Sequence, residues 1–229
     1  MVESTGFENR QRRKLLGSSN LPSSANLGIN FMDPQTIETY NKMAKEYDDD
    51  TVDFWEIFPK TVIDRFVSLA REKILSVGSG PGRDSLLLKK KGLEVICLDA
   101  SEAMTKLSRE NGLESVLGDF NNPPFDERTF DGVWAYTSLL HIPKKDIDKP
   151  LREISRVLKD KGALCLGLIE GNSEGYKENA GLNMPRWFSF YEKPEIEKLL
   201  TKHGFEIVYF EEFKPRSKNY LNFIARKIN

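Results

Sequence analysis

Three glycines follow a short apolar run in the stretch KILSVGSGPG, residues 73–82. Ordering a glycine costs more conformational entropy than ordering any other residue, and glycine adds no side chain to a core. Gly78, Gly80 and Gly82 therefore indicate a tight turn or a backbone that a ligand approaches closely. If a strand precedes this turn and a helix follows it, the unpaired N–H groups at the helix N-terminus face the ligand.

Pro81 and the spacing of the glycines argue against one class of ligand. Dinucleotide-binding loops have the pattern G-x-G-x-x-G, whereas this loop reads G-x-G-P-G. Proline has no N–H group, so Pro81 removes a donor that a bound pyrophosphate would use. The loop remains able to bind a carboxylate or to lie beside a ribose.

A second chemical marker, Asp99, ends the apolar segment EVICLD, 21 positions after Gly78. A carboxylate at the tip of the second strand of such a unit can accept hydrogen bonds from both ribose hydroxyls. Either feature alone has a purely structural interpretation, because a glycine loop is often only a tight turn. Together, on successive strands, they predict a site for a ligand that contains a nucleoside.

The segments that must position these residues alternate between apolar runs and amphipathic stretches. Strands are predicted at residues 73–77, 94–99, 115–119, 130–136 and 162–171, and helices at 82–92, 101–111 and 144–162. A helix at 193–204 precedes strands at 205–213 and 219–228, which must pair antiparallel because their connection is short. We therefore expect an α/β fold with a doubly wound, mostly parallel seven-stranded sheet, an antiparallel C-terminal hairpin, and helices on both faces.

The N-terminal part of the chain lacks this alternation. Residues 17–30 are rich in Ser, Asn, Gly and Pro, so we predict a disordered tail over residues 1–30 and a single domain over 31–229. A first helix is predicted to begin at Asp33 as N-cap, with Pro34 in its first position, and to end at the acidic run 48–50. A second helix is predicted over 54–70, with Pro59 in its first turn.

The composition excludes several classes of protein. The 229 residues carry a net charge of −1, which gives no overall attraction to nucleic acid or to anionic lipid. No apolar run approaches the roughly 18 residues of a membrane helix, and residues 1–30 lack the apolar segment of a secretory signal. Cys97 and Cys165 lie in apolar runs and are expected to be buried thiols in a reducing compartment, the cytoplasm, with a disulfide as the alternative. No Cys/His cluster has the spacing of a metal site.

The motifs ILSVGSGPGRDS, GLEVICLDASEAM, LGDFNNPPFDERTFDGVWAYTSLLHI and LREISRVLKDKGAL follow one another along the chain. In order and spacing they resemble the class I S-adenosylmethionine-dependent methyltransferases, from about Tyr40 to the C-terminus. The resemblance implies a Rossmann-like fold and S-adenosylmethionine as the cofactor. It also matches the predicted C-terminal hairpin, because the sheet of that family ends in an inserted antiparallel strand.

The resemblance also implies roles for individual positions. Asp99 would hold the ribose hydroxyls and Asp119 the adenine amino group, while Tyr40 and Tyr47, on the N-terminal helices of residues 31–70, would close over the cofactor. The other implied cofactor contacts are Gly78, Ser79, Gly80, Ala100, Met104, Phe120 and Tyr136. One position departs from the family: Ser76 stands where an acid is usual. The departure implies either a lower affinity for the cofactor or compensation by another acid such as Glu170.

His141 and the segment 170–195 are the candidates for chemistry and substrate contact. His141 follows the fourth strand, where it would serve as a general base or only support the loop. The segment 170–195 is predicted to be a loop over the pocket, with aromatic side chains that form a small-molecule site or pack the next helix. Its substrate candidates are Arg186, Trp187, Phe188 and Tyr191, with Tyr191 also a candidate catalytic residue. Arg186 would pair with an acidic substrate or with Glu192.

These observations favour methyl transfer from S-adenosylmethionine to an O, N or S atom of a small molecule. The transfer would be an in-line displacement that depends on proximity and orientation. After the cofactor domain no separate substrate domain remains, which favours a small acceptor. We also expect a monomer or homodimer without a membrane partner. Two alternatives stay open: methylation of tRNA or protein, for which the basic run RQRRK is weak support, and cofactor binding without catalysis.

Overall fold

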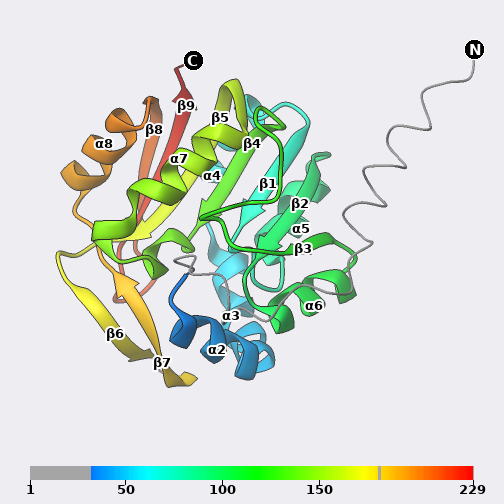
Figure 1. Ribbon diagram of the computed structural model, residues 1–229, viewed down its shortest axis with the longest axis vertical. Helices are drawn as coiled ribbons and strands as arrows, with labels where there is room; N and C mark the ends of the chain where they lie inside the picture. The colour runs from blue at the N-terminus through cyan, green and yellow to red at the C-terminus, as the bar shows by residue number, and fades with distance from the viewer. Residues whose placement is uncertain (1–31, 180–181, 229) are drawn as a thin grey trace, which may run out of the picture. The chain divides into compact units, whose positions relative to one another are not determined.

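The computed structural model describes residues 32–179 and 182–228, which belong to one compact unit, Phe31–Asn229. The predicted tail, residues 1–30, lies outside the described residues. Within the described part, seven strands form one sheet in the order β3-β2-β1-β4-β5-β9-β8 (Figure 1). This arrangement confirms the predicted fold class.

The strand pairing is parallel except at β9. The parallel strands are β1 (Lys73–Val77), β2 (Glu94–Asp99), β3 (Glu114–Leu117), β4 (Phe130–Tyr136) and β5 (Leu158–Ile169). β9 (Tyr220–Lys227) pairs antiparallel with both β5 and β8 (Phe205–Phe213). The short link between β8 and β9 thus produces the expected antiparallel hairpin at one edge of the sheet.

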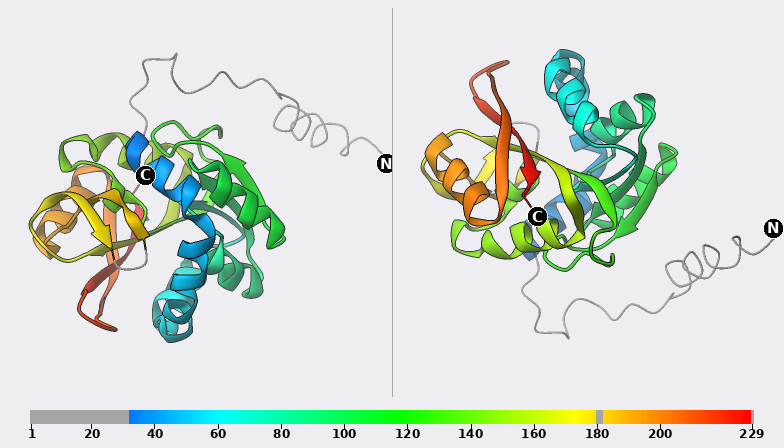
Figure 2. Two further views of the ribbon diagram at one scale, coloured as in Figure 1. Left: turned by 90° about the horizontal axis from the view of Figure 1, so that it is seen from below. Right: turned by 90° about the horizontal axis from the view of Figure 1, so that it is seen from above.

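Helices bury both faces of the sheet. In β1, Leu75 joins the apolar cluster under α7 (Asp148–Val157) and α8 (Lys193–Lys202), whereas Ile74 joins the cluster under α4 (Lys60–Leu69) and α5 (Arg83–Lys90). This alternation follows from the two-residue period of a strand, and it explains why the central strands carry apolar residues on both faces. α6 (Glu102–Glu110) packs beside β2 and β3. Figure 2 shows helices on both sides of the sheet.

Cys97 and Cys165 are buried in the cluster under α4 and α5, and both are free thiols. Burial raises the pKa of each thiol, so both behave as small apolar side chains. None of the described helices is both long enough and apolar enough to cross a membrane.

The N-terminal helices differ from prediction in their lengths. α2 (Pro34–Lys42) begins as expected, because the Asp33 carboxylate accepts from the Thr36 N–H at 2.8 Å. The prediction that the helical segment ends at residues 48–50 is wrong, since α3 (Ala44–Ile57) continues through them. The acids lie in mid-helix, away from the negative C-terminal end of the dipole, and Asp48 pairs with Arg83 at 2.7 Å.

Two further boundaries also differ from prediction. Residues 54–57 belong to α3, and Pro59 is the N-cap of α4 rather than part of its first turn. The helix predicted over 144–162 ends at Val157, because the chain turns directly into a longer β5. η3 (Lys144–Asp146), a short 3₁₀ turn, precedes that helix.

The segment predicted as a loop over residues 170–195 forms a hairpin instead. β6 (Glu174–Asn179) and β7 (Leu182–Ser189) pair antiparallel and make a separate two-stranded sheet. In β7, Leu182, Arg186 and Phe188 are buried at even spacing, which is the period of a strand. The hairpin and α2 lie at the same edge of the main sheet (Figure 1).

The packing of α4 on the sheet yields a stability prediction. Phe66 is fully buried against Trp134, with ring centroids 5.1 Å apart. Phe66→Ala is expected to lower the free energy of unfolding by about 3–5 kcal/mol, because the cavity left behind cannot fully collapse. Urea denaturation measures this change. Val52→Ala, at a position of α3 that is 41% exposed, is the control and should change it by less than about 0.5 kcal/mol.

Candidate active site

The glycine turn after β1 has the backbone conformation that its sequence predicts. Gly78 has φ of +61° and Gly80 φ of +55°, a left-handed region that other residues rarely adopt. The Gly78 N–H donates to the Leu98 carbonyl at 2.8 Å, so the turn is fixed to the end of β2. A Cβ atom on Gly78 would lie 2.4 Å from the Ser138 Cβ, whereas one on Gly80 would meet only the Tyr47 ring, at 3.8 Å.

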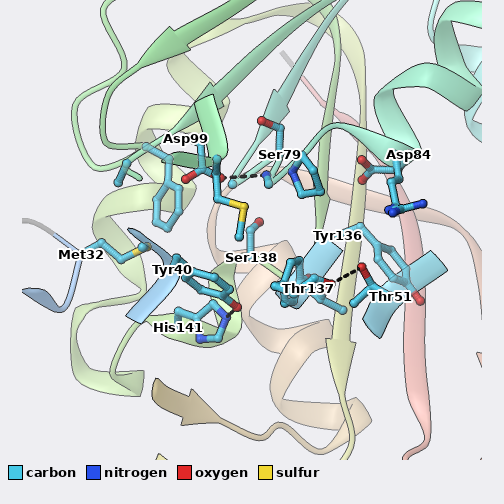
Figure 3. A pocket seen from close by; sticks show the side chains of 18 of the residues that line it. Met32, Tyr40, Thr51, Ser79, Asp84, Asp99, Tyr136, Thr137, Ser138 and His141 are labelled. Atoms are coloured by element: carbon cyan, nitrogen blue, oxygen red, sulfur yellow. Dashed lines mark hydrogen bonds between the residues drawn. The ribbon is translucent and has the colours of Figure 1, made fainter. Parts of the chain in front are cut away.

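Asp99 joins this turn to the start of α6. Its Oδ2 accepts from the Gly80 N–H at 2.8 Å, and its Oδ1 accepts from the Ser101 N–H at 2.8 Å. Burial raises the pKa of Asp99 to about 6, although these hydrogen bonds favour the ionised form. A carboxylate has about four lone-pair positions, and Asp99 lines a cavity at this edge of the sheet (Figure 3). It therefore retains acceptor capacity for a ligand with two adjacent hydroxyls.

One wall of this cavity, beside Asp99, is apolar. It consists of Met32, Ala100, Met104 and Phe120. Asp119 is not among the residues that line the cavity. Its carboxylate accepts from the N–H groups of Met32 and Asn121, at 2.7 and 2.8 Å. Asp119 thus holds the chain segment that carries Met32 beside the apolar wall.

Aromatic side chains form the opposite wall. The rings of Tyr40 and Tyr47 meet edge to face with centroids 5.3 Å apart, and Trp55 meets Tyr136 in the same way at 5.5 Å. Burial raises the pKa of all three tyrosines, so each hydroxyl stays protonated at neutral pH. The faces of such rings attract a cation.

His141 lies in the short 3₁₀ turn η2 (Leu139–His141), and both of its ring nitrogens are engaged. Nδ1–H donates to the Trp187 carbonyl at 2.6 Å, so Nε2 accepts from the Tyr40 hydroxyl at 2.8 Å. The same hydroxyl accepts from Arg186 Nη1 at 2.9 Å. Burial lowers the pKa of His141 to about 3. The histidine is neutral at pH 7 and fixes the orientation of Tyr40.

A larger cavity of about 630 Å³ adjoins the first and shares part of its wall. The residues common to both cavities are Tyr40, Tyr47, Thr51, Trp55, Thr137 and His141. β7 contributes Leu182, Arg186 and Phe188, and the link between β8 and β9 contributes residues 215–218. Trp187 and Tyr191, both predicted substrate contacts, line neither cavity.

Tyr191 and Trp187 have other contacts. Tyr191 is 1% exposed, and the Lys144 ammonium lies 4.9 Å from its ring centroid. The Trp187 indole donates to Ser189 at 3.0 Å, while its backbone carbonyl accepts from His141.

The structure brings ten of the eleven predicted cofactor positions to the first cavity, together with His141. The exception is Asp119.

Several lining residues were not found from the sequence. They are Met32, Thr51, Pro81, Arg83, Asp84, Thr137 and Ser138. Thr137 and Ser138 directly follow β4. The criterion that identified Tyr136, a position at the end of the fourth strand, would also have identified them. Asp84, at the start of α5, is buried with its pKa raised to about 6 and accepts from the Trp134 indole at 2.7 Å. Glu170, the acid suggested as a substitute at the Ser76 position, is exposed and outside the cavity, whereas Asp84 lines it.

The chemistry of the first cavity fits an adenosine-containing cofactor. It combines a carboxylate with free acceptor capacity, a glycine backbone without side chains, an apolar wall and aromatic faces for a cation. The buried hydroxyls of Ser79, Tyr136 and Ser138 have no hydrogen-bond partner in the part of the chain that the structure describes, so they are available to a ligand. The volume of this cavity is about 60 Å³.

Comparisons with known proteins agree with this chemistry. The family model of a methyltransferase domain matches residues 75–166. A demethylmenaquinone methyltransferase of Thermotoga maritima is 30% identical over 174 residues, covering 72% of this chain and 69% of that protein. A sarcosine/dimethylglycine N-methyltransferase of Halorhodospira halochloris is 32% identical over 204 residues, covering 80% of this chain and 70% of that protein.

A solved structure shows the same fold. The 1,6-didemethyltoxoflavin-N1-methyltransferase of Burkholderia thailandensis, with 1,6-didemethyltoxoflavin and S-adenosylhomocysteine bound, superposes with a TM-score of 0.65. The match has 20% identity and covers 84% of this chain and 88% of that chain. Because relatives at 30% and 32% identity match most of their own length, the chain belongs to the class I S-adenosylmethionine-dependent methyltransferases and is an enzyme with S-adenosylmethionine as its cofactor.

Proposed function

We propose that this enzyme methylates an O, N or S atom of a small molecule that binds in the larger cavity. The observation that carries the proposal is the position of this cavity of about 630 Å³, which shares Tyr40, Thr137 and His141 with the cofactor cavity. A volume in this range is typical of small-molecule sites. The names of the Thermotoga and Burkholderia enzymes, which act on demethylmenaquinone and 1,6-didemethyltoxoflavin, support a small acceptor.

In this proposal the glycine turn and Asp99 bind the ribose, and the wall with Ala100 and Met104 packs against the adenine. Asp119 contributes indirectly, through the segment that carries Met32. Asp84 takes over the role of the acid that is absent at Ser76, because it is the buried carboxylate at this turn. Free buried thiols further support a cytoplasmic enzyme whose residues 31–229 form one domain.

The residues of this chain contribute orientation rather than proton transfer. When bound, S-adenosylmethionine supplies the methyl group, which leaves a sulfonium in one in-line displacement. The aromatic wall of Tyr40, Tyr47 and Tyr136 favours the cation and excludes water. His141 acts through Tyr40, since both of its nitrogens are engaged and its pKa is about 3. Proximity and alignment of the acceptor then provide most of the rate.

The proposal is tested by measuring release of S-adenosylhomocysteine with three kinds of acceptor. We expect turnover with members of a small-molecule library and none with bulk tRNA or with a denatured protein mixture. Turnover with tRNA or protein and with no small molecule would contradict the proposal. Binding of S-adenosylmethionine without any turnover would favour a cofactor-binding protein without catalysis.

The position of Asp99 predicts both an affinity and a pH dependence. Asp99→Asn is expected to weaken S-adenosylhomocysteine binding by about ten- to a hundredfold at pH 7.5, because a charged acceptor is lost. In the unaltered enzyme, affinity should fall from pH 7.5 to pH 5, since the pKa of Asp99 is about 6 and protonation removes acceptors. Calorimetry measures both effects.

The Asp99→Asn variant should lose affinity less steeply as the pH falls. The pKa of Asp84 is also about 6, so a smaller pH dependence is expected to remain. Asp126→Asn changes an exposed loop carboxylate and serves as the control, with unchanged affinity. Equal affinities of the Asp99→Asn variant and the unaltered enzyme would rule out the ribose role of Asp99.

Alanine substitutions at two glycines with positive φ distinguish a loss of cofactor binding from the effect of backbone strain on stability. Gly80 (φ +55°) faces the cavity, whereas a Cβ atom on Gly92 (φ +90°) would have no other atom within 4 Å. Gly80→Ala and Gly92→Ala should each lower the free energy of unfolding by about 1–2 kcal/mol. Only Gly80→Ala should also weaken S-adenosylhomocysteine binding, by about tenfold, because its methyl group occupies ligand space. A similar loss of affinity in Gly92→Ala would remove the case for a special role of Gly80.

A further inference from the structure

Arg186 is a buried cation without a carboxylate partner among the described residues. Its side chain belongs to a residue that is 5% exposed, and none of the ion pairs within the described ranges includes it. Within residues 32–179 and 182–228, its one hydrogen bond runs from Nη1 to the Tyr40 hydroxyl at 2.9 Å. The Nε–H is buried and has no partner in the same ranges.

Such an arrangement is unfavourable unless a ligand completes it. A guanidinium remains charged at any physiological pH, and a buried charge is costly when no counter-charge faces it. The rings of Tyr40 and Phe188 each lie 5.2 Å from the guanidinium carbon. Aromatic faces offset part of the cost, but they leave the Nε–H donor unused.

A second cation lies beside Arg186. The Lys218 ammonium is 5.9 Å from the centroid of the same Phe188 ring. Partial burial and the nearby guanidinium both lower the pKa of Lys218. Arg216 also lines the larger cavity, whereas among the described residues the only acid in its lining is Asp50, an exposed residue of α3. The described lining of this cavity therefore carries more positive than negative charge.

We propose that Arg186 and Lys218 bind the carboxylate of the methyl acceptor, so that the substrate is a small carboxylic acid. This inference rests on the proposed function of the larger cavity. The free Nε–Nη2 edge of Arg186 presents two parallel N–H donors, which match the two oxygens of a carboxylate. A phosphate ester carries more charge and a third oxygen, for which this edge has no donor. Leu182 and Phe188 supply apolar contacts for the body of the acid.

The cofactor's own carboxylate is a weaker candidate for this site. Arg186 lines the larger cavity and is absent from the lining of the cofactor cavity. Tyr40 lines both cavities, and its hydroxyl accepts from Arg186 at 2.9 Å. The guanidinium is thereby held on the acceptor side of the aromatic wall.

Calorimetry with the enzyme saturated with S-adenosylhomocysteine tests this site, with benzoate, benzamide and phenyl phosphate as probes. Benzoate is expected to bind at least tenfold more tightly than benzamide. Arg186→Met should reduce benzoate affinity at least tenfold and Arg186→Lys by less, while the affinity for S-adenosylhomocysteine changes less than threefold. Lys218→Met, in an exposed link, should weaken benzoate binding without affecting folding. Lys214→Met, which changes an exposed lysine outside the cavity, is the control and should bind benzoate as the unaltered enzyme does.

Several results would overturn the carboxylate site. Among the probes, these results are equal binding of benzoate and benzamide, or tighter binding of phenyl phosphate than of benzoate. Among the variants, one such result is unchanged benzoate binding in both Arg186→Met and Lys218→Met. Another is a loss of S-adenosylhomocysteine affinity in Arg186→Met that is as large as the loss of benzoate affinity. The acceptor screen separates this inference from the proposed function. If neutral amides are methylated as efficiently as the matched acids, the carboxylate site fails and the proposed function stands. If no small molecule is methylated although benzoate binding depends on Arg186, the proposed function fails and the anion site stands.

Discussion

The carboxylate of Asp99 fixes the geometry of the cofactor site. Its two oxygens accept from Gly80 and Ser101, so it ties the turn after β1 to the start of the helix after β2. Parallel pairing brings these two strand ends to the same edge of the sheet, and the glycine turn lets the backbone approach the carboxylate. Burial raises the pKa of Asp99 and so destabilises its ionised form. Further hydrogen-bond donors would stabilise the ionised form. A bound ribose would supply such donors.

The polar groups beyond this edge form a chain of hydrogen bonds. This chain does not transfer a proton to or from a substrate. The Trp187 carbonyl, His141, the Tyr40 hydroxyl and Arg186 are joined in sequence. The neutral histidine donates from Nδ1 and accepts at Nε2. The Tyr40 hydroxyl therefore donates its hydrogen bond to His141. Hydrogen bonds between buried groups rigidify a site, so the ring of Tyr40 is held in one orientation beside the cofactor cavity.

The sequence was sufficient for features that depend on local pattern. Apolar runs, the N-cap Asp33 and the glycines identified the elements and most of the cofactor cavity, because each of these patterns depends only on residues nearby in the sequence. The hairpin β6–β7 and the course of α3 were missed, since both depend on distant partners. Asp48 is neutralised by Arg83, and the alternation in β7 becomes meaningful only when Arg186 and Phe188 face the cavity.

The two segments that the sequence described least well are also bound to each other. The Thr39 hydroxyl donates to the Pro185 carbonyl at 2.7 Å, and the Trp187 N–H donates to the Thr36 hydroxyl at 2.8 Å. Figure 2 shows α2 beside the hairpin when the molecule is seen from below. α2 covers the cofactor cavity through Tyr40, and β7 lines the larger cavity through Arg186. Because the two hydrogen bonds fix α2 against β7, the side chains that cover one cavity and those that line the other are held in one relative arrangement.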